Sequence, residues 1–136
     1  RFASQKGFDL IAHIASELAA KDVSIVALGT GEQKYEDMFR WWAAVRPDRV
    51  GVRVGYDNAL AHRITGGADM ILMPSRYEPC GLNQIYGLRY GTLPLVRATG
   101  GLADTVQPGT GFQFWGQSGH DLYGAARYAI DAFADQ

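Results

Sequence analysis

The stretch VSIVALGTG, residues 23–31, decides the fold class of this chain. Val23–Leu28 form a near-continuous apolar run of strand length, and the run ends in Gly29-Thr30-Gly31. An apolar run without polar alternation is typical of a strand that helices cover on both faces. Open parallel sheets bind their ligands in the loops that follow such strands. The stretch therefore predicts a parallel α/β fold with a binding edge at Gly29–Gly31.

Helical and extended patterns alternate along the rest of the chain. Apolar residues recur at helical spacing in Gly7–Ala20, which predicts a helix with one buried face. Further helices are expected at Gln33–Val45, Asn58–Thr65, Leu82–Tyr90, Leu102–Val106 and across Leu122–Phe133. Strands are expected at Val50–Val54, Met70–Met73, Pro94–Val96 and, at a sheet edge, Phe112–Trp115. This order predicts a Rossmann-like parallel sheet with helices on both faces, and Asn58 is the expected N-cap of its helix.

The first helix has no strand before it, because Arg1 already lies in what should be a strand-to-helix loop. We therefore expect the first strand of the sheet to be missing and an open edge in its place. A chain of 136 residues is long enough for one domain with a real core. We interpret residues 1–136 as a single domain of a longer protein.

Composition argues against several classes of partner. The net charge of −1 comes without a basic run, so no nucleic-acid partner is expected. No window approaches the roughly 20 apolar residues of a membrane helix, so no membrane partner is expected. No pair among the three histidines has a metal-ligand spacing, and no metal is expected. The single cysteine, Cys80, cannot form an internal disulfide, which favours a reducing compartment.

The run PSRYEPCGLNQ, residues 74–84, is the most informative for function. Glu78 stands just before Gly81, which the pattern places at the start of a helix. Backbone N–H groups at a helix N-terminus bind phosphate, while a nearby carboxylate can hold a sugar hydroxyl. In a parallel sheet this loop meets Arg1–Gly7, Gly29–Gly31, Gly55–Asp57 and Thr99–Gly101 at one edge. The combination predicts chemistry on a sugar phosphate.

Several long motifs in this chain match a known family in order and spacing. They are Arg1 with Ser4–Gly7, Leu28–Gly31, Gly55-Tyr56, Ala68-Asp69, Pro74–Leu82, Tyr90–Thr92 and Thr99–Val106. The chain resembles, over essentially its whole length, the C-terminal domain of bacterial glycogen synthases and plant starch synthases. The resemblance implies the donor-binding half of a two-domain glycosyltransferase of the GT-B type.

The activity implied by the resemblance is transfer of glucose from ADP-glucose to the non-reducing end of an α-1,4-glucan. The family retains the anomeric configuration and needs neither metal nor cofactor. It binds the glucan through an N-terminal domain that this chain lacks, so we expect the fragment to bind ADP weakly and to transfer no glucose. The resemblance implies a bacterial cytoplasm or a plastid stroma.

The resemblance also implies roles for charged residues. Arg1 and Lys6 match the pair that clamps the diphosphate, a task that suits a guanidinium fork and an ammonium group. From spacing alone, solvated surface charges are the better explanation for both, and the motif match reverses this preference. Glu78 matches the glutamate that contacts the donor glucose, and its alternative role is to stabilise a helix start. Many related enzymes carry a second glutamate where this chain has Tyr86, a departure that favours the starch-synthase branch.

The remaining residues implied in nucleotide-sugar binding are mostly glycines and backbone groups. Tyr56 matches the position where adenine stacks, although an aromatic residue after a strand is often a core-rim residue. Cys80 contributes its backbone and is otherwise a small buried residue. Gln84 offers a side-chain amide, and helix packing or solvation is its equal alternative. The full set is Gly29, Gly31, Gly55, Tyr56, Cys80, Gly81, Leu82, Asn83, Gln84, Thr99, Gly100 and Gly101.

Two other classes stay open at this point. A different GT-B enzyme that uses UDP-glucose would share the fold and the arginine–lysine clamp, but Glu78–Leu82 with Tyr86 argues against it. A non-catalytic nucleotide- or glucan-binding module is the second alternative.

Overall fold

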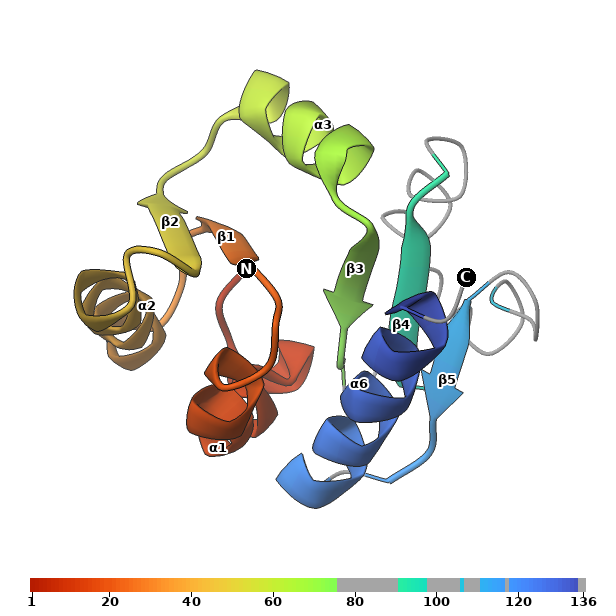
Figure 1. Cartoon of the computed structure of the whole chain (residues 1–136). Coiled ribbons are helices and arrows are strands. Elements are labelled where there is room, and N and C mark those ends of the chain that lie inside the picture. Colours follow the sequence, from red (N-terminus) through yellow and green to blue (C-terminus); the bar gives the residue numbers. More distant parts are fainter. Residues whose placement is uncertain (76–90, 98–105, 107–110, 117, 135–136) are drawn as a thin grey trace.

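The computed structural model describes residues 1–75, 91–97, 106, 111–116 and 118–134. Helices and strands alternate there along the chain (Figure 1). The helices are η1 (Ser4–Lys6), α1 (Phe8–Ala19), α2 (Gln33–Val45), α3 (Asn58–Gly67) and α6 (Gly119–Ala134). The strands are β1 (Ile25–Gly29), β2 (Val50–Val54), β3 (Met70–Met73), β4 (Leu93–Arg97) and β5 (Phe112–Phe114). The helix expected at 82–90 lies outside the described residues, as does the one expected at 102–106 apart from Val106, which is not helical.

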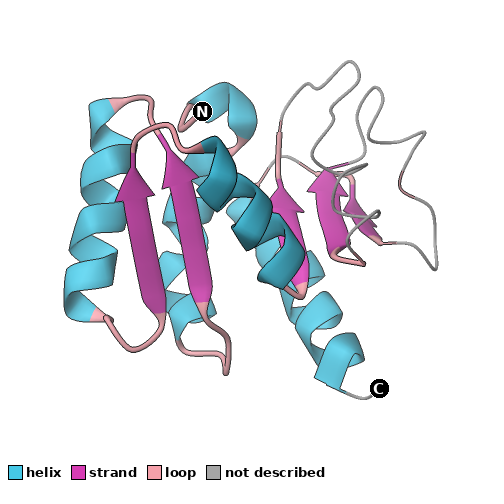
Figure 2. Ribbon diagram, turned by 90° about the horizontal axis from the view of Figure 1, so that it is seen from above, coloured by secondary structure: helices cyan, strands magenta, loops and turns pink. Residues whose placement is uncertain are grey.

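The described strands form two parallel sheets. One sheet has the order β1-β2 and the other the order β3-β4-β5. Ile25 pairs with Val50 in the first sheet, and Met70 pairs with Leu93 in the second. The arrows of all five strands point the same way in Figure 2. Among the described residues no strand joins β1 to β3, so the expected open edge lies between the two sheets, and β5 is an edge strand as predicted.

Helices lie on both sides of the strands, which confirms the predicted α/β class. α1, α2 and α6 share one apolar core with the sheets, whereas α3 lies on the opposite side (Figures 1 and 2). The buried face of α1 comprises Leu10, Ile11, Ile14, Leu18 and Ala19. Burying a leucine or isoleucine side chain stabilises a fold by about 1.5–3 kcal/mol, so this face accounts for the docking of the helix. No helix in the described ranges is long and apolar enough to span a membrane.

Two sequence-based boundaries are corrected by hydrogen bonds. The N-cap of α3 is Asp57 rather than Asn58, because Asp57 has an extended backbone and its side chain accepts a hydrogen bond from Leu60 N at 2.9 Å. Strand β1 begins at Ile25 rather than Val23. Val23 N donates to Lys21 O at 2.9 Å in a turn, and pairing starts only where Ile25 N donates to Arg49 O at 2.7 Å.

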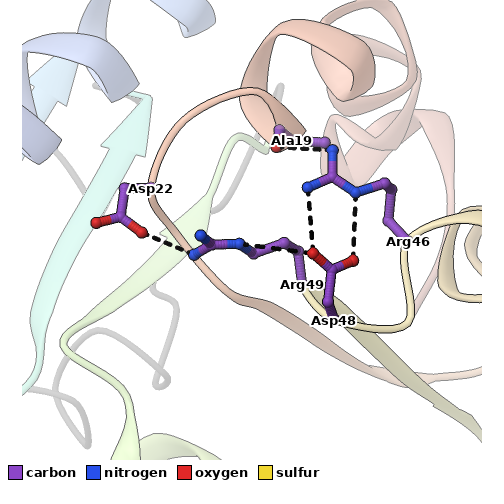
Figure 3. A network of polar contacts seen from close by, with 5 residues as sticks. All are labelled: Ala19, Asp22, Arg46, Asp48 and Arg49. Atoms are coloured by element: carbon purple, nitrogen blue, oxygen red, sulfur yellow. Dashed lines mark hydrogen bonds and ion pairs between the residues drawn. The ribbon is translucent and has the colours of Figure 1, made fainter.

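A group of mostly exposed polar contacts joins α1 to the connection between α2 and β2. This amino-end network consists of Ala19, Asp22, Arg46, Asp48 and Arg49 (Figure 3). Arg46 donates to Ala19 O at 3.3 Å and to Asp48 Oδ1 at 3.3 Å, and Arg49 Nη1 lies 2.8 Å from Asp22 Oδ1. The hydrogen bond from Arg46 lowers the pKa of Asp48. The network lies at the amino ends of β1 and β2, away from the edge where the predicted loops gather.

Candidate functional site

The Arg1–Gly7 loop is fixed to the carboxyl end of β1 through the backbone of Phe2. Phe2 N donates to Thr30 O at 2.8 Å, and Glu32 N donates to Phe2 O at 2.8 Å. Phe2 and Gly31 thereby form a parallel bridge. Figure 2 shows the N-terminus beside the tips of the β1 and β2 arrows. The first two predicted loops are therefore side by side.

The side chain of Phe2 anchors the same loop in the core. Its ring is only 2% exposed and lies 5.1 Å from the Phe8 ring and 5.0 Å from the Phe39 ring, centroid to centroid. Phe2 also explains the glycine at position 31, because a Cβ there would overlap the carbonyl oxygen of Phe2. Close backbone approach of this kind requires glycine.

The first turn of α2 contacts both loops. Glu32 Oε2 accepts a hydrogen bond from Ser4 N at 3.0 Å, and the Tyr35 hydroxyl lies 2.7 Å from Ser4 Oγ. Glu36 Oε2 accepts from Gly31 N at 3.0 Å. The amide of Gly31 is thus already bonded to a carboxylate. A direct ligand role for Gly31 stays a prediction.

The loop after β2 joins the same edge. Gly55 N donates to Gly29 O at 3.0 Å, which brings Gly55 beside the glycine loop. Tyr56 is 92% exposed, so it is not the core-rim residue that its position also allowed. An exposed aromatic ring at a sheet edge can stack on a flat ligand.

The end of β3 meets the first loop at Gly7. Gly7 has a φ of 81°, and a Cβ there would overlap the carbonyl oxygen of Pro74. The end of β4 reaches the same segment, because Arg97, only 7% exposed, donates from Nε to Ser75 O at 2.9 Å. Pro74 and Ser75 open the run that leads to Glu78. The predicted convergence of the first four loops therefore holds for their described parts.

The described part of the site comprises two charged residues, three glycines and one aromatic residue. They are Arg1, Lys6, Gly29, Gly31, Gly55 and Tyr56. The other predicted site residues lie outside the described residues: Glu78, Cys80, Gly81, Leu82, Asn83, Gln84, Thr99, Gly100 and Gly101. Within the described ranges, no three histidine, cysteine or acidic residues are grouped as a metal ion would need.

Sequence reasoning missed the residues that hold these loops in place, which are Glu32, Tyr35, Glu36 and Arg97. One signal was available, because Glu32 directly follows the glycine turn and Glu36 lies in the first turn of α2. The partners of Glu32 and Tyr35, by contrast, lie about thirty residues away and have no local pattern.

A parallel α/β sheet whose loops gather at the carboxyl ends of its strands defines the class of open α/β ligand-binding domains. A family model described as glycosyl transferases group 1 matches residues 1–131. The chain belongs to this family.

Similar proteins agree with the resemblance predicted from the motifs. Over its full length the chain is 54% identical to a glycogen synthase of Koribacter versatilis and 45% identical to one of Clostridioides difficile. The chain spans 30% of the length of each relative.

Solved structures with the same fold include plant and bacterial enzymes. The catalytic domain of starch synthase IV from Arabidopsis thaliana, bound to ADP and acarbose, matches with a TM-score of 0.85 and 30% identity. That match covers 100% of this chain and 30% of the starch synthase chain. Sucrose-phosphate synthase from Thermosynechococcus elongatus matches with a TM-score of 0.75 at 24% identity, over 96% of this chain and 34% of its own, and shows the fold alone.

Proposed function

We propose that this chain is the donor-binding domain of a retaining glucosyltransferase that moves glucose from ADP-glucose to the non-reducing end of an α-1,4-glucan. The observation that carries the proposal is the docking of the Arg1–Gly7 loop on the carboxyl edge of the sheet, against Gly31 and Pro74. This docking brings two cations to the edge where open α/β domains bind ligands. The identity with glycogen synthases and the ADP bound in the similar starch synthase support the choice of donor.

Arg1 and Lys6 supply the positive charge that the diphosphate needs. A guanidinium binds phosphate oxygens through paired hydrogen bonds, whereas an ammonium acts as a point charge. Negative charge grows on the diphosphate as its bond to glucose breaks. The two cations therefore stabilise the transition state more than the ground state, and this difference is what accelerates a reaction.

The other predicted site residues contact different parts of the ADP-glucose donor. Tyr56 stacks on the adenine, and Glu78 contacts the glucose. The backbone of Cys80–Asn83, together with Gly29, Gly31 and Gly55, approaches the phosphates and the sugar. Gln84 and Thr99–Gly101 complete the pocket.

In this proposal, glucose transfer needs a further domain besides these 136 residues. The chain spans 30% of the length of its glycogen synthase relatives, and we assign the glucan to an N-terminal domain of the longer protein. Incubation of the 136-residue chain with ADP-glucose and glycogen should therefore produce no glucan elongation. The bacterial source of the relatives supports the cytoplasm as the compartment.

Isothermal titration calorimetry with ADP tests the clamp. Arg1→Ala and Lys6→Ala should each weaken ADP binding about tenfold or more, because hydrogen bonds to charged groups contribute about 1.5–3 kcal/mol. Arg127→Ala, an exposed arginine on α6, is the control and should bind ADP like the unchanged chain. Equal affinity in all four proteins would overturn the clamp. Tighter binding of UDP than of ADP would favour the UDP-sugar alternative.

A further inference from the structure

We propose that the first turn of α2 positions the diphosphate clamp, with Glu32 and Tyr35 acting as positioning residues on Ser4. This inference rests on the proposed function, since it concerns the loop that carries Arg1 and Lys6. Neither residue needs to touch the nucleotide.

Ser4 is held through both its backbone and its side chain. Its amide donates to Glu32 Oε2 at 3.0 Å, and its Oγ lies 2.7 Å from the Tyr35 hydroxyl. Ser4 is the first residue of η1, and Lys6 is the last. The turn is closed by Gly7 N, which donates to Ser4 O at 3.0 Å. Holding Ser4 therefore fixes the turn that carries Lys6.

Tyr35 is a rigid support for this contact. Its side chain is 4% exposed and packs 6.2 Å from the Phe8 ring, centroid to centroid. Burial of the ring leaves its hydroxyl little freedom, and a buried hydroxyl left without a partner is costly. The hydroxyl and Ser4 Oγ satisfy each other.

The side chain of Glu32 does not cap α2, although Glu32 occupies the N-cap position of that helix. A carboxylate at an N-cap usually accepts a hydrogen bond from the first turn of its helix. The Glu32 side chain makes no such bond and instead reaches across to Ser4 N. Its hydrogen bond therefore goes to the clamp loop, beside a longer ion pair with Lys34 of α2.

The charge of Glu32 supports positioning rather than ligand binding. A carboxylate repels a diphosphate, so this side chain is unsuited to contact the diphosphate directly. One of its oxygens accepts from Ser4 N, and the other lies 3.9 Å from Lys34 Nζ. These two contacts partly balance the negative charge of Glu32 within the protein.

The test compares ADP with AMP, because only ADP carries the second phosphate that the clamp binds. Calorimetry on the 136-residue chain gives the ratio of the AMP to the ADP dissociation constant. Glu32→Ala and Tyr35→Phe should each reduce this ratio about fivefold, the effect of losing one hydrogen bond. Glu32→Gln should keep the ratio, because its amide oxygen still accepts from Ser4 N.

Two substitutions provide matched controls. Asp37→Asn removes an exposed carboxylate from the same helix, and Tyr128→Phe removes the hydroxyl of an exposed tyrosine. Both should leave the ratio unchanged. A thermal melt of each variant reports stability separately from the ratio.

The outcomes separate the inference from the function on which it rests. A lower ratio in Glu32→Ala and Tyr35→Phe, with Glu32→Gln close to the unchanged chain, supports positioning. Lower melting temperatures with an unchanged ratio mean a structural role alone and overturn the inference while the clamp stands. If the unchanged chain does not prefer ADP to AMP, the clamp itself fails and the inference fails with it.

Discussion

The two ends of the β1–β2 sheet are held by different kinds of contact, although α2 contributes to both. At the carboxyl end, the first turn of α2 accepts hydrogen bonds from the amides of Ser4 and Gly31. At the amino end, Arg46, directly after α2, donates to Ala19 O and pairs with Asp48. The first end fixes loops that bear candidate site residues, whereas the second joins scaffold segments.

The difference in solvent exposure decides how much the contacts at each end contribute to the stability of the fold. Phe2 is 2% exposed at the carboxyl end, whereas the side chains of Asp48 and Asp22 are 64% and 94% exposed at the amino end. Water and salt screen exposed ion pairs, which contribute only about 0–1 kcal/mol. The buried ring of Phe2 and the carboxylate-bound amides of Ser4 and Gly31 contribute more stability than these exposed ion pairs. The chain thus has its stronger contacts where the candidate site needs fixed loops.

The largest expected effect comes from removing the aromatic anchor of the carboxyl end. Phe2→Ala should lower the free energy of unfolding by about 3–5 kcal/mol, because it leaves a cavity beside Phe8 and Phe39. Denaturant unfolding followed by circular dichroism measures the loss. Phe133→Ala, at a 37% exposed phenylalanine, should cost clearly less. Equal losses in the two variants would contradict the contrast between anchor and surface.

The second prediction concerns the carboxylate on the glycine loop. Glu36→Met keeps the approximate size of the side chain and leaves Gly31 N without its acceptor, so the free energy of unfolding should fall by about 1–3 kcal/mol. Glu36→Gln should lose less, because the amide oxygen can still accept. Asp37→Met, at a 61% exposed side chain on the same helix, is the control. A loss in Asp37→Met as large as that in Glu36→Met would show that the hydrogen bond between Gly31 N and Glu36 adds no stability.

Local patterns in the sequence predicted the fold well. Helix α2 has the predicted bounds, Gln33 to Val45, because its apolar residues repeat at a period that needs no tertiary information. Strand β2 likewise matches at Val50–Val54. Strand β1 was shifted by two residues at its start, since the turn at Lys21–Val23 depends on a backbone hydrogen bond that apolar character does not reveal.

The site was predictable only in part. Family motifs located Arg1, Lys6 and Tyr56, and the rule for parallel sheets indicated that their loops would meet. The contacts that fix these loops join Ser4 to Glu32 and Tyr35, or Arg97 to Ser75, across long stretches of chain. Such pairs follow from tertiary packing and have no spacing rule. The family motifs therefore pointed to the candidate site residues but not to the contacts that support their loops.

The third prediction tests the corrected helix start on the loop that carries Tyr56. Asp57→Ala should lower the free energy of unfolding by about 1 kcal/mol, because the side chain accepts from Leu60 N at the N-cap of α3. Asn58→Ala should have a smaller effect, since Asn58 is already helical. Thermal unfolding of both variants measures the difference. A greater loss in Asn58→Ala would restore Asn58 as the cap.

The smallest effect is expected in the amino-end network, and it should depend on pH. The hydrogen bond from Arg46 lowers the pKa of Asp48 below its ordinary value of 3.8. A carboxyl group with a lowered pKa in the folded state adds stability above its unfolded pKa and loses that stability as the pH falls through its folded pKa. Asp48→Asn should therefore be slightly less stable than the unchanged chain at pH 7.

The same logic makes the stability difference disappear in acid, because the unchanged chain then protonates Asp48 and loses the same interaction. Unfolding measured from pH 7 into acid should show the two stability curves approaching each other as the pH falls below 3.8, the ordinary pKa of Asp48. ADP affinity should not change, since Asp48 lies at the opposite end of the sheet from Arg1 and Lys6. A stability difference that does not shrink as the pH falls below 3.8, or a change in ADP affinity, would contradict the view that the amino end only joins scaffold segments.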